Sequence, residues 1–588
     1  MTDGKKIFPF IALFMIAVLP LLGACSGSNS GSGAPVYEKT IQQMTEYIEQ
    51  QMAASGVKGL SIVLVDNQRT VWARGFGRAD VAKDVPATAD TQFEIGSNSK
   101  TFAGVMIAQL VERGLIRIDD PLTLYLTDFS VNQPLGFPAG GSVTIRNMMT
   151  HHSGIAGDVF NGAFTIGSPR PNMYRWLRDY LRTDYLDFPT DFVLSYSNTA
   201  AALTAEVIAA ATGIDFATNS EILFDTLGMN QTAASLDSPK AAASMSKSYR
   251  SGQEVGPFYC NIGPAGSIIS TANDMARYVK MIMAGGMGER GRVMAPATLE
   301  MMLATQPYPP LDHAMHTGFF WIVNDADLDY AGRLCWHNGG TAAMMSHMEI
   351  LRDHKLAVVV LSNTAEAGGA VANIAKHALK LALEEKTGIK PPPPFAPEYS
   401  PPVTWDQAKL DGLTGIYVRS NEGYMKVTRT GGALQWTDGA VTTTVIPRAN
   451  GWFSAADSQA LQYEFTAISG RDVIVAHGGN SAALLAEKYT PVAIPAEWHA
   501  RVGTWDAVNL DPDDFLRHLP GGGNPSYELS VADGMLLWED TRVVQPVDAA
   551  RGYVRGLGRN MGTAFQVFIV GDDNHEELQY LGVRFRKR

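Results

Sequence analysis

The stretch FEIGSNSKTF, residues 93–102, places a serine and a lysine three positions apart, directly before an apolar helical pattern. Residues three apart on a helix share one face, so the Ser97 hydroxyl and the Lys100 amine are predicted to point into the same space. A buried lysine can lose its charge and act as a base. The free N–H groups at a helix start can also face a developing negative charge. The alternative is that Ser97 only caps the helix and Lys100 lies at the surface.

The bulk composition describes a folded, acidic protein. The chain has 588 residues, which allows ~2–4 domains. Hydrophobic residues make up 46% and charged residues 18%, which excludes a disordered chain. The net charge of −12, with no long basic block, argues against a nucleic-acid partner. The three cysteines show no zinc-site spacing, so neither a metal nor another cofactor is predicted.

The first 25 residues have the pattern of a targeting segment, with two lysines, an apolar run over 7–22 and the ending LLGAC at Cys25. This ending resembles the lipobox of bacterial lipoproteins, in which the cysteine is lipidated. A Gly/Ser-rich tether follows at 26–36. We therefore expect an exported protein that is anchored to a membrane by a lipid on Cys25 and faces the periplasm or the cell exterior. The alternatives are an ordinary cleaved signal and an uncleaved N-terminal anchor.

Export would leave Cys260 and Cys335 as a pair in an oxidising compartment, where disulfides form. The two residues either form a disulfide or are two separate buried thiols, which behave as small apolar side chains. The sequence leaves both alternatives open.

Sequence patterns divide the rest of the chain into three folded parts. Residues 37–389 combine helical patterns with a β-hairpin at 59–80, which predicts an α+β domain with a mixed sheet and an inserted helical lobe. The proline-rich linker at 390–404 is a stiff spacer. Short alternating runs then predict antiparallel β-barrels at 405–492 and 493–588, and one larger barrel is the alternative.

Two further motifs carry groups suited to acyl chemistry. The sequence SYSN holds Tyr196, which can move a proton, and Asn198, whose amide can hold a substrate or the lysine. The sequence CWHNGGT places His337 beside glycines on a strand, where a ligand backbone can approach and the N–H near Gly340 can serve as a second oxyanion donor. Taken singly, each motif is better explained as structure: a buried tyrosine with an asparagine cap, and a hairpin turn with a lone histidine.

Taken together, the order and spacing of these motifs resemble the serine β-lactamase and penicillin-binding protein superfamily. The best match is with class C β-lactamase-like hydrolases, in the esterase and D-aminopeptidase branch, over roughly Tyr37 to Gly388. The stretches TIRNMMTHHSGI, GPAGSIISTANDMARYV and VVVLSNT are similar to that family as well. The resemblance implies a β-lactamase-like fold, with an antiparallel sheet flanked by helices, an α-helical lobe and the site between them.

The resemblance also implies a role for each matching residue. Ser97 would be the acylated nucleophile, Lys100 its base partner, and Tyr196 a general base and acid. The backbone N–H groups of Ser97 and Gly340 would form the oxyanion hole. His337 would stand where true β-lactamases have a lysine, which argues against robust β-lactam hydrolysis and favours the esterase and D-aminopeptidase branch. The residues expected to bind substrate are Asn198, Asn338 and Gly339.

The C-terminal region is similar, more weakly, to the barrels that follow the catalytic domain in D-aminopeptidase, where a barrel loop reaches the site. By position, the irregular stretch Leu510–Ser526 is predicted to be such a loop. We interpret His151 and His152, in a loop that matches the family, as structural.

The resemblance implies that the protein is a serine hydrolase that cleaves small amides or peptides, among them peptides with D-residues, or esters. The alternatives are a carboxylesterase with no peptide role and a non-catalytic ligand-binding relative.

Overall fold

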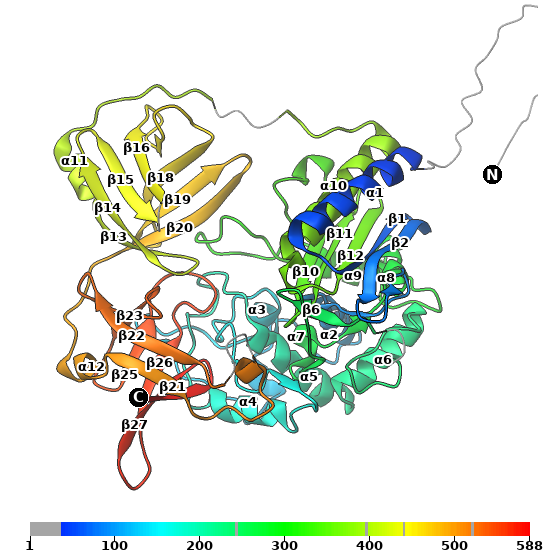
Figure 1. Cartoon of the computed structure of the whole chain (residues 1–588), viewed down its shortest axis with the longest axis horizontal. Coiled ribbons are helices and arrows are strands. Elements are labelled where there is room, and N and C mark those ends of the chain that lie inside the picture. The colour runs from blue at the N-terminus through cyan, green and yellow to red at the C-terminus, as the bar shows by residue number, and fades with distance from the viewer. Residues whose placement is uncertain (1–36, 242–244, 394–397, 439–440, 519–522) are drawn as a thin grey trace, which may run out of the picture. The chain divides into compact units, whose positions relative to one another are not determined.

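A computed structural model gives the fold of this protein and describes residues 37–241, 245–393, 398–438, 441–518 and 523–588 (Figure 1). The expected leader, the tether and the lipidated Cys25 lie outside the described residues. From Tyr37 to Arg588 the chain forms one compact unit. The domain boundaries expected from the sequence stay predictions.

The frame of the first part is a six-stranded sheet in the order β10-β11-β12-β1-β2-β3. All of its pairings are antiparallel, which confirms the antiparallel sheet that the family resemblance implies. The mixed sheet expected from the local patterns is wrong, because hairpin turns join β10 to β11, β11 to β12 and β1 to β2, and such turns connect only antiparallel strands. The predicted hairpin at 59–80 is formed by β1 and β2. The strands are β1 (Gly59–Asp66), β2 (Arg69–Asp80), β3 (Val85–Pro86), β10 (Leu334–Gly340), β11 (Met345–Leu351) and β12 (Leu356–Ser362).

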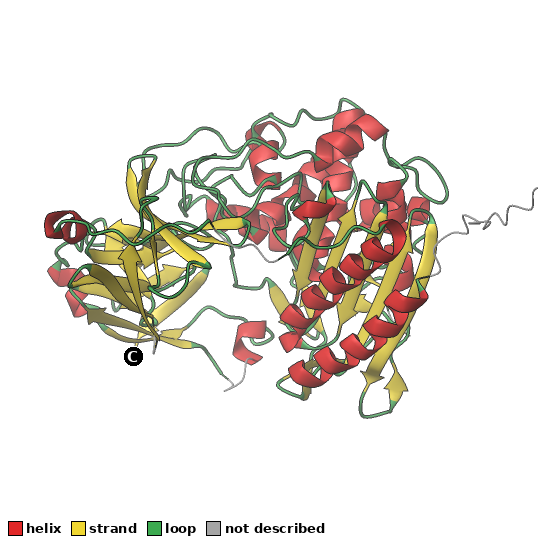
Figure 2. Cartoon of the chain, turned by 90° about the horizontal axis from the view of Figure 1, so that it is seen from above, coloured by secondary structure: helices red, strands yellow, loops and turns green. Residues whose placement is uncertain are grey.

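Helices cover both faces of this sheet, as Figure 2 shows from above. Successive strand residues point to opposite faces, and β12 is buried along its whole length because both faces are covered. Val358 and Val360 pack with the long helices α1 (Glu38–Ser55) and α10 (Gly368–Thr387). Val359 and Leu361 belong to the core on the other face, where α8 (Ala272–Met283) lies against β1 and β12.

A helical lobe is inserted between β3 and β10, as predicted. Its entry is a single 3-10 turn, η1 (Gly96–Asn98), that runs into the buried helix α2 (Ser99–Glu112). The other helices of the lobe are α3 (Ile145–Met149), α4 (Met173–Leu181), α5 (Asn198–Thr212), α6 (Phe216–Leu227), α7 (Gly263–Gly266) and α9 (Pro296–Leu303). Its short strand pairs are β4 (Phe93–Glu94) with β9 (Ile269–Ser270), β5 (Phe164–Ile166) with β8 (Phe258–Cys260), and β6 (Ser248–Arg250) with β7 (Gln253–Val255).

The C-terminal region forms two closed antiparallel barrels of eight strands each, which confirms two units rather than one larger barrel. The first comprises β13 (Gly415–Arg419), β14 (Tyr424–Thr430), β15 (Ala433–Asp438), β16 (Val441–Pro447), β17 (Phe453–Ser454), β18 (Leu461–Ile468), β19 (Arg471–Gly478) and β20 (Ser481–Tyr489), with α11 (Gln407–Gly412) before it. The second comprises β21 (Gly503–Ala507), β22 (Ser526–Ala532), β23 (Met535–Trp538), β24 (Arg542–Pro546), β25 (Arg551–Val554), β26 (Ala564–Val570), β27 (His575–Tyr580) and β28 (Val583–Lys587), with α12 (Ala496–Ala500) before it.

The disulfide considered between Cys260 and Cys335 is not formed, and both thiols are free. Cys335 is fully buried in the sheet core, whereas Cys260 is half-buried in β8 of the lobe, near Gly266. Burial raises the pKa of each thiol to about 12, so both stay protonated. No single described helix is long and apolar enough to cross a membrane, and α5 with α6 passes that test only as a pair bent by 81°.

Candidate active site

Ser97 and Lys100 lie in mutual contact at the junction between η1 and α2. In a 3-10 turn the side chains at positions i and i+3 eclipse each other. The Lys100 Nζ atom donates a hydrogen bond to Ser97 Oγ at 3.0 Å. Lys100 is fully buried, while Ser97 is partly open to solvent. The hydroxyl can therefore meet a substrate while the amine is shielded.

The surroundings of Lys100 disfavour its charged form. Burial is the largest effect, and the positive charge of Arg559 adds to it, so that the pKa of Lys100 lies well below its usual value. The amine also donates to Asn198 Oδ1 at 2.6 Å and to the carbonyl oxygen of Ala265 at 2.8 Å. These acceptors hold the amine against Ser97, and the lowered pKa makes the neutral, basic form accessible.

Tyr196 completes the group around the serine. Its phenol hydrogen-bonds to the Ser97 side chain. Its ring has Lys100 Nζ 4.9 Å and the Arg559 guanidinium carbon 5.0 Å from the centroid. Burial raises the pKa of Tyr196 above its usual value, so the phenol is protonated at neutral pH.

The end of β10 packs directly on the serine turn. Gly96 has a φ of +52°, and a Cβ there would lie 2.7 Å from the backbone nitrogen of Gly340. Only a glycine allows this close approach at a left-handed φ. The contact brings the backbone of Gly340 next to the turn that carries Ser97.

The other β10 residues divide between the two faces of the strand. His337 is buried, with Nδ1 2.5 Å from the carbonyl oxygen of Asn338, and burial lowers the pKa of His337 to about 3, so the ring is neutral. A Cβ on Gly339 would lie 2.0 Å from the Ile95 carbonyl oxygen, so this glycine is required for packing. The exposed Asn338 alternates to the opposite side of the strand. Of the three residues expected to bind substrate, only Asn198 lies in the group around Ser97.

The two adjacent histidines differ in their surroundings. His152 is buried between Thr150 and Asp312, with its Nε2 atom 2.7 Å from Asp312 Oδ2. His151 lies nearer the site than expected: its ring centroid is 4.2 Å from that of Tyr196, and its Nδ1 atom accepts a hydrogen bond from the backbone N–H of Ser197. His151 therefore supports the face of Tyr196.

Three polar residues of the site carry no sequence signal. Asp158 is a buried carboxylate that accepts a hydrogen bond from Asn198 Nδ2 at 2.7 Å. Arg559 and Asn560, from the loop at 555–563 between β25 and β26, bind the same carboxylate. The glycine-rich sequence RGLGRNMG is the local feature that could have drawn attention to this loop, but it is also typical of an ordinary barrel turn.

The stretch Leu510–Ser526 also contacts the hydrolase part. Asp514 accepts a hydrogen bond from the Gly162 N–H at 2.7 Å, and Phe515 packs edge-on against Phe258 at 5.3 Å. Phe515 also packs in a small apolar cluster with Ala342 and Ala343, just beyond Gly340. Residues 519–522 of this stretch lie outside the described residues. Several loops of the second barrel therefore contact the hydrolase part, and the one at 555–563 touches Tyr196.

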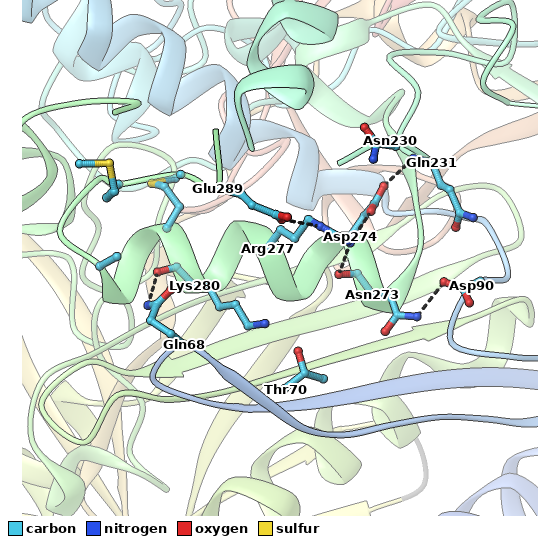
Figure 3. A pocket seen from close by; sticks show the side chains of 14 residues that line it. Gln68, Thr70, Asp90, Asn230, Gln231, Asn273, Asp274, Arg277, Lys280 and Glu289 are labelled. Atoms are coloured by element: carbon cyan, nitrogen blue, oxygen red, sulfur yellow. Dashed lines mark hydrogen bonds and ion pairs between the residues drawn. The ribbon is translucent and has the colours of Figure 1, made fainter. Parts of the chain in front are cut away.

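A separate polar cavity of about 760 Å³ lies between the β1–β2 turn and α8 (Figure 3). Figure 3 shows Arg277 held between Asp274 and Glu289, and the Gln68 side chain donating a hydrogen bond to the carbonyl oxygen of Lys280. None of its lining residues is Ser97, Lys100, Tyr196 or a contact of these. Its lining residues include no serine.

Glu94 is a buried carboxyl group three residues before the serine. The Thr341 hydroxyl, directly after Gly340, donates to Glu94 Oε2 at 2.5 Å. Thr341 Oγ1 also accepts from the backbone N–H of Met344, which closes the turn after β10. Burial raises the pKa of Glu94 to about 7, so its proton is held at pH values where an exposed glutamate has lost it.

This raised pKa makes stability depend on pH. Between pH ~4.3, where an unfolded glutamate titrates, and the folded value of about 7, folded protein keeps a proton that unfolded protein releases. Unfolding is therefore favoured as pH rises through this range. Glu94→Gln does not titrate, so its free energy of unfolding should rise relative to wild type by roughly 3 kcal/mol between pH 4.5 and 8. Urea unfolding at both pH values measures this difference.

Glu112→Gln is the matched control, because hydrogen bonds from Thr298 and from the Ala295 N–H lower the pKa of Glu112. That variant should show a small difference of the opposite sign. An identical pH profile for Glu94→Gln and wild type would contradict the buried, protonated state of Glu94.

Comparisons with known proteins agree with this geometry. The family described as Beta-lactamase matches residues 44–383. The human protein "Putative beta-lactamase-like 1" is 28% identical over 314 residues, which are 50% of this chain and 61% of that protein. "Penicillin-binding protein 4" of Amycolatopsis lactamdurans is 26% identical over 340 residues, 56% of this chain and 85% of that protein. The chain thus spans about three fifths of the human relative's length.

Solved structures share the fold at low sequence identity. The octameric penicillin-binding protein homologue from Pyrococcus abyssi has a TM-score of 0.52 at 21% identity, covering 76% of this chain and 99% of that one. SurE with D-Leu has a TM-score of 0.51 at 19% identity, covering 77% and 100%. The matched family spans more than half of the chain and contains every part of the serine–lysine–tyrosine group. The chain belongs to the Beta-lactamase family.

Proposed function

We propose that the protein is a serine hydrolase that forms an acyl-enzyme on Ser97 and cleaves small amides or peptides, among them peptides with D-residues, or esters. The observation that carries the proposal is the 3.0 Å contact between the Lys100 amine and the Ser97 hydroxyl. A serine hydroxyl becomes a nucleophile only when a nearby base removes its proton. Lys100 is buried, and its lowered pKa suits it to that task.

Acylation would use the three side chains in order. Lys100 takes the proton of Ser97 as Oγ bonds to the substrate carbonyl carbon, and the resulting oxyanion faces the N–H groups of Ser97 and Gly340. The carbon–nitrogen or carbon–oxygen bond then breaks while Tyr196 gives its proton to the leaving group. The phenolate then takes back the proton held by the Lys100 ammonium, which restores the neutral amine and the protonated phenol.

Deacylation would run the same groups in reverse. A water molecule gives one proton to the Lys100–Tyr196 pair as its oxygen bonds to the ester carbon. The bond to Ser97 breaks, and the proton returns to Oγ. The acid product leaves and the free serine is restored.

The neutral His337 bears on the choice of substrate. True β-lactamases have a lysine at this position, which gives a substrate carboxylate a permanent charge to bind. A histidine with a pKa of about 3 gives none. This favours substrates without a carboxylate at that end, such as aminoacyl amides and short esters. SurE, which was solved with D-Leu, shares the fold and motivates the inclusion of D-aminoacyl substrates in the test.

The direct test is covalent labelling with a fluorophosphonate, followed by peptide mapping, and a turnover screen with D- and L-aminoacyl amides, short esters and nitrocefin. We expect one adduct per chain on Ser97, turnover of amides or esters, and little nitrocefin hydrolysis. Turnover of esters alone would favour a carboxylesterase. The absence of both adduct and turnover would favour a non-catalytic binding protein and refute the proposal.

We also propose that Cys25 carries a lipid that holds the exported enzyme at a membrane, on the sequence grounds given above. A Cys25→Ala variant should move from the membrane fraction to the soluble fraction when cells are fractionated, because the lipid anchor can no longer be attached. Ser26→Ala, at the next position, serves as the control and should stay with the membrane. Membrane retention of the Cys25→Ala variant would contradict the lipid anchor.

A further inference from the structure

A polar chain links the second barrel to the active site. Arg559 Nε donates to Asp158 Oδ2 at 3.0 Å and Arg559 Nη2 donates to Asp158 Oδ1 at 2.9 Å. Asn560 Nδ2 donates to Asp158 Oδ2 at 3.0 Å. The Asp158 side chain is 8% exposed and that of Arg559 is 45% exposed. A carboxylate inside the hydrolase part is thus satisfied largely by a loop that lies 401 residues further along the chain.

Asp158 in turn sets the orientation of Asn198. The amide NH₂ of Asn198 points to Asp158 at 2.7 Å, so its oxygen points to the Lys100 amine at 2.6 Å. A flipped amide would turn its oxygen toward the carboxylate and its NH₂ toward the amine, and both contacts would be unfavourable. The carboxylate therefore determines which acceptor Lys100 meets.

The loop at 555–563 fits closely against the hydrolase part. A Cβ on Gly157 would lie 2.4 Å from Asn560 Oδ1, and a Cβ on Gly562 would lie 2.0 Å from the Asp187 carbonyl oxygen. The Ser195 hydroxyl donates to the Gly558 carbonyl oxygen at 3.3 Å. These close contacts hold the loop in place rather than leaving Arg559 to swing freely.

We propose that the loop at 555–563 is a positioning element of the active site, acting on Lys100 through Asp158. This inference rests on the proposed function, because it concerns the base of the same reaction. Arg559 and Asn560 are positioning residues: they hold Asp158, which holds Asn198, which holds the amine against Ser97. The second barrel is then a working part of the enzyme.

The opposite charges of Arg559 and Asp158 predict opposite effects on how the labelling rate depends on pH. Arg559 disfavours the charged form of Lys100, whereas Asp158 favours it. Loss of the guanidinium should move the acid limb of the pH profile of the labelling rate to higher pH, because Lys100 then keeps its proton up to a higher pH. Loss of the carboxylate charge should move that limb to lower pH. The other titratable groups that face Lys100 are unchanged in both variants: Cys260, His151, His337 and Tyr196.

The experiment measures the rate of fluorophosphonate labelling from pH 5 to 10 in the full chain, for Arg559→Ala and Asp158→Asn. We expect the labelling rate at pH 7 to fall about tenfold in each, since small displacements of a catalytic group are costly, with the acid limb shifted upward in the first variant and downward in the second. Arg559→Lys should keep the charge and restore the position of the limb. If Arg559→Ala does not fold, the pH profiles of Asp158→Asn and Arg559→Lys still test the positioning role of the loop.

Arg551→Ala is the matched control. Arg551 is also 45% exposed, pairs with Asp548 of the same barrel, and contacts the hydrolase part through the Tyr185 hydroxyl at 3.0 Å. We expect its rate and profile to match those of wild type. Unchanged limbs in Arg559→Ala and Asp158→Asn would overturn the positioning role. An unlabelled wild-type enzyme would instead refute the acyl-enzyme, so the two failures are distinguishable.

Discussion

Ser97→Ala is expected to abolish covalent labelling and to lower kcat by about 10⁴-fold or more, because the only nucleophile of the group is removed. The loss should be confined to chemistry. The Ser97 side chain contacts Lys100 and Tyr196 at the open end of the cluster, and alanine fits the 3-10 turn. The melting temperature should change little. Steady-state turnover of the best substrate and labelling stoichiometry measure the two effects.

Ser99→Ala is the matched control, two residues along in the same buried segment. The Ser99 hydroxyl accepts a hydrogen bond from the Ile268 N–H at 3.1 Å and faces the lobe core. Its loss leaves a buried N–H without its acceptor, at a cost of about 1–3 kcal/mol in stability. We expect the opposite pattern from that of Ser97→Ala: weaker folding with labelling retained. Labelling of Ser97→Ala at wild-type stoichiometry would place the nucleophile elsewhere.

Lys100→Met is expected to slow acylation about 10³-fold, because the substitution removes the base and leaves an uncharged side chain of similar length. The variant keeps the apolar stem but has no group to take the serine proton. It also leaves Asn198 Oδ1 and the Ala265 carbonyl oxygen without the amine donor. The two buried acceptors without a donor should lower the free energy of unfolding. Part of this loss should be offset, because the variant no longer buries an amine.

Pre-steady-state labelling separates slower acylation from lower stability, since it reports the acylation rate per folded molecule. Lys240→Met is the control: that lysine pairs with Glu221 at 2.6 Å on the surface of the lobe. Its variant should label at the wild-type rate. An acylation rate in Lys100→Met within tenfold of wild type would show that another group activates Ser97.

Local patterns in the sequence were sufficient for much of the fold. The hairpin at 59–80 and the alternating runs beyond residue 405 have a period of two residues, which a strand imposes on any chain. The pairing of Ser97 with Lys100 belongs to the same class, because one helical turn brings residues three apart together whatever the rest of the chain does.

Tertiary structure alone decided the remaining features. Both cysteines are free, Cys335 on β10 and Cys260 on β8 of the lobe, and the sequence had left this open. Asn338 is turned away from His337 by the pleat of β10. The support of Asn198 by Asp158 and Arg559 joins groups 401 residues apart, and no local periodicity encodes such a contact. It exists because a barrel loop packs on the lobe. The sequence by itself thus determined the reactive turn and the strand patterns, whereas the packing of separate elements decided which charges surround that turn.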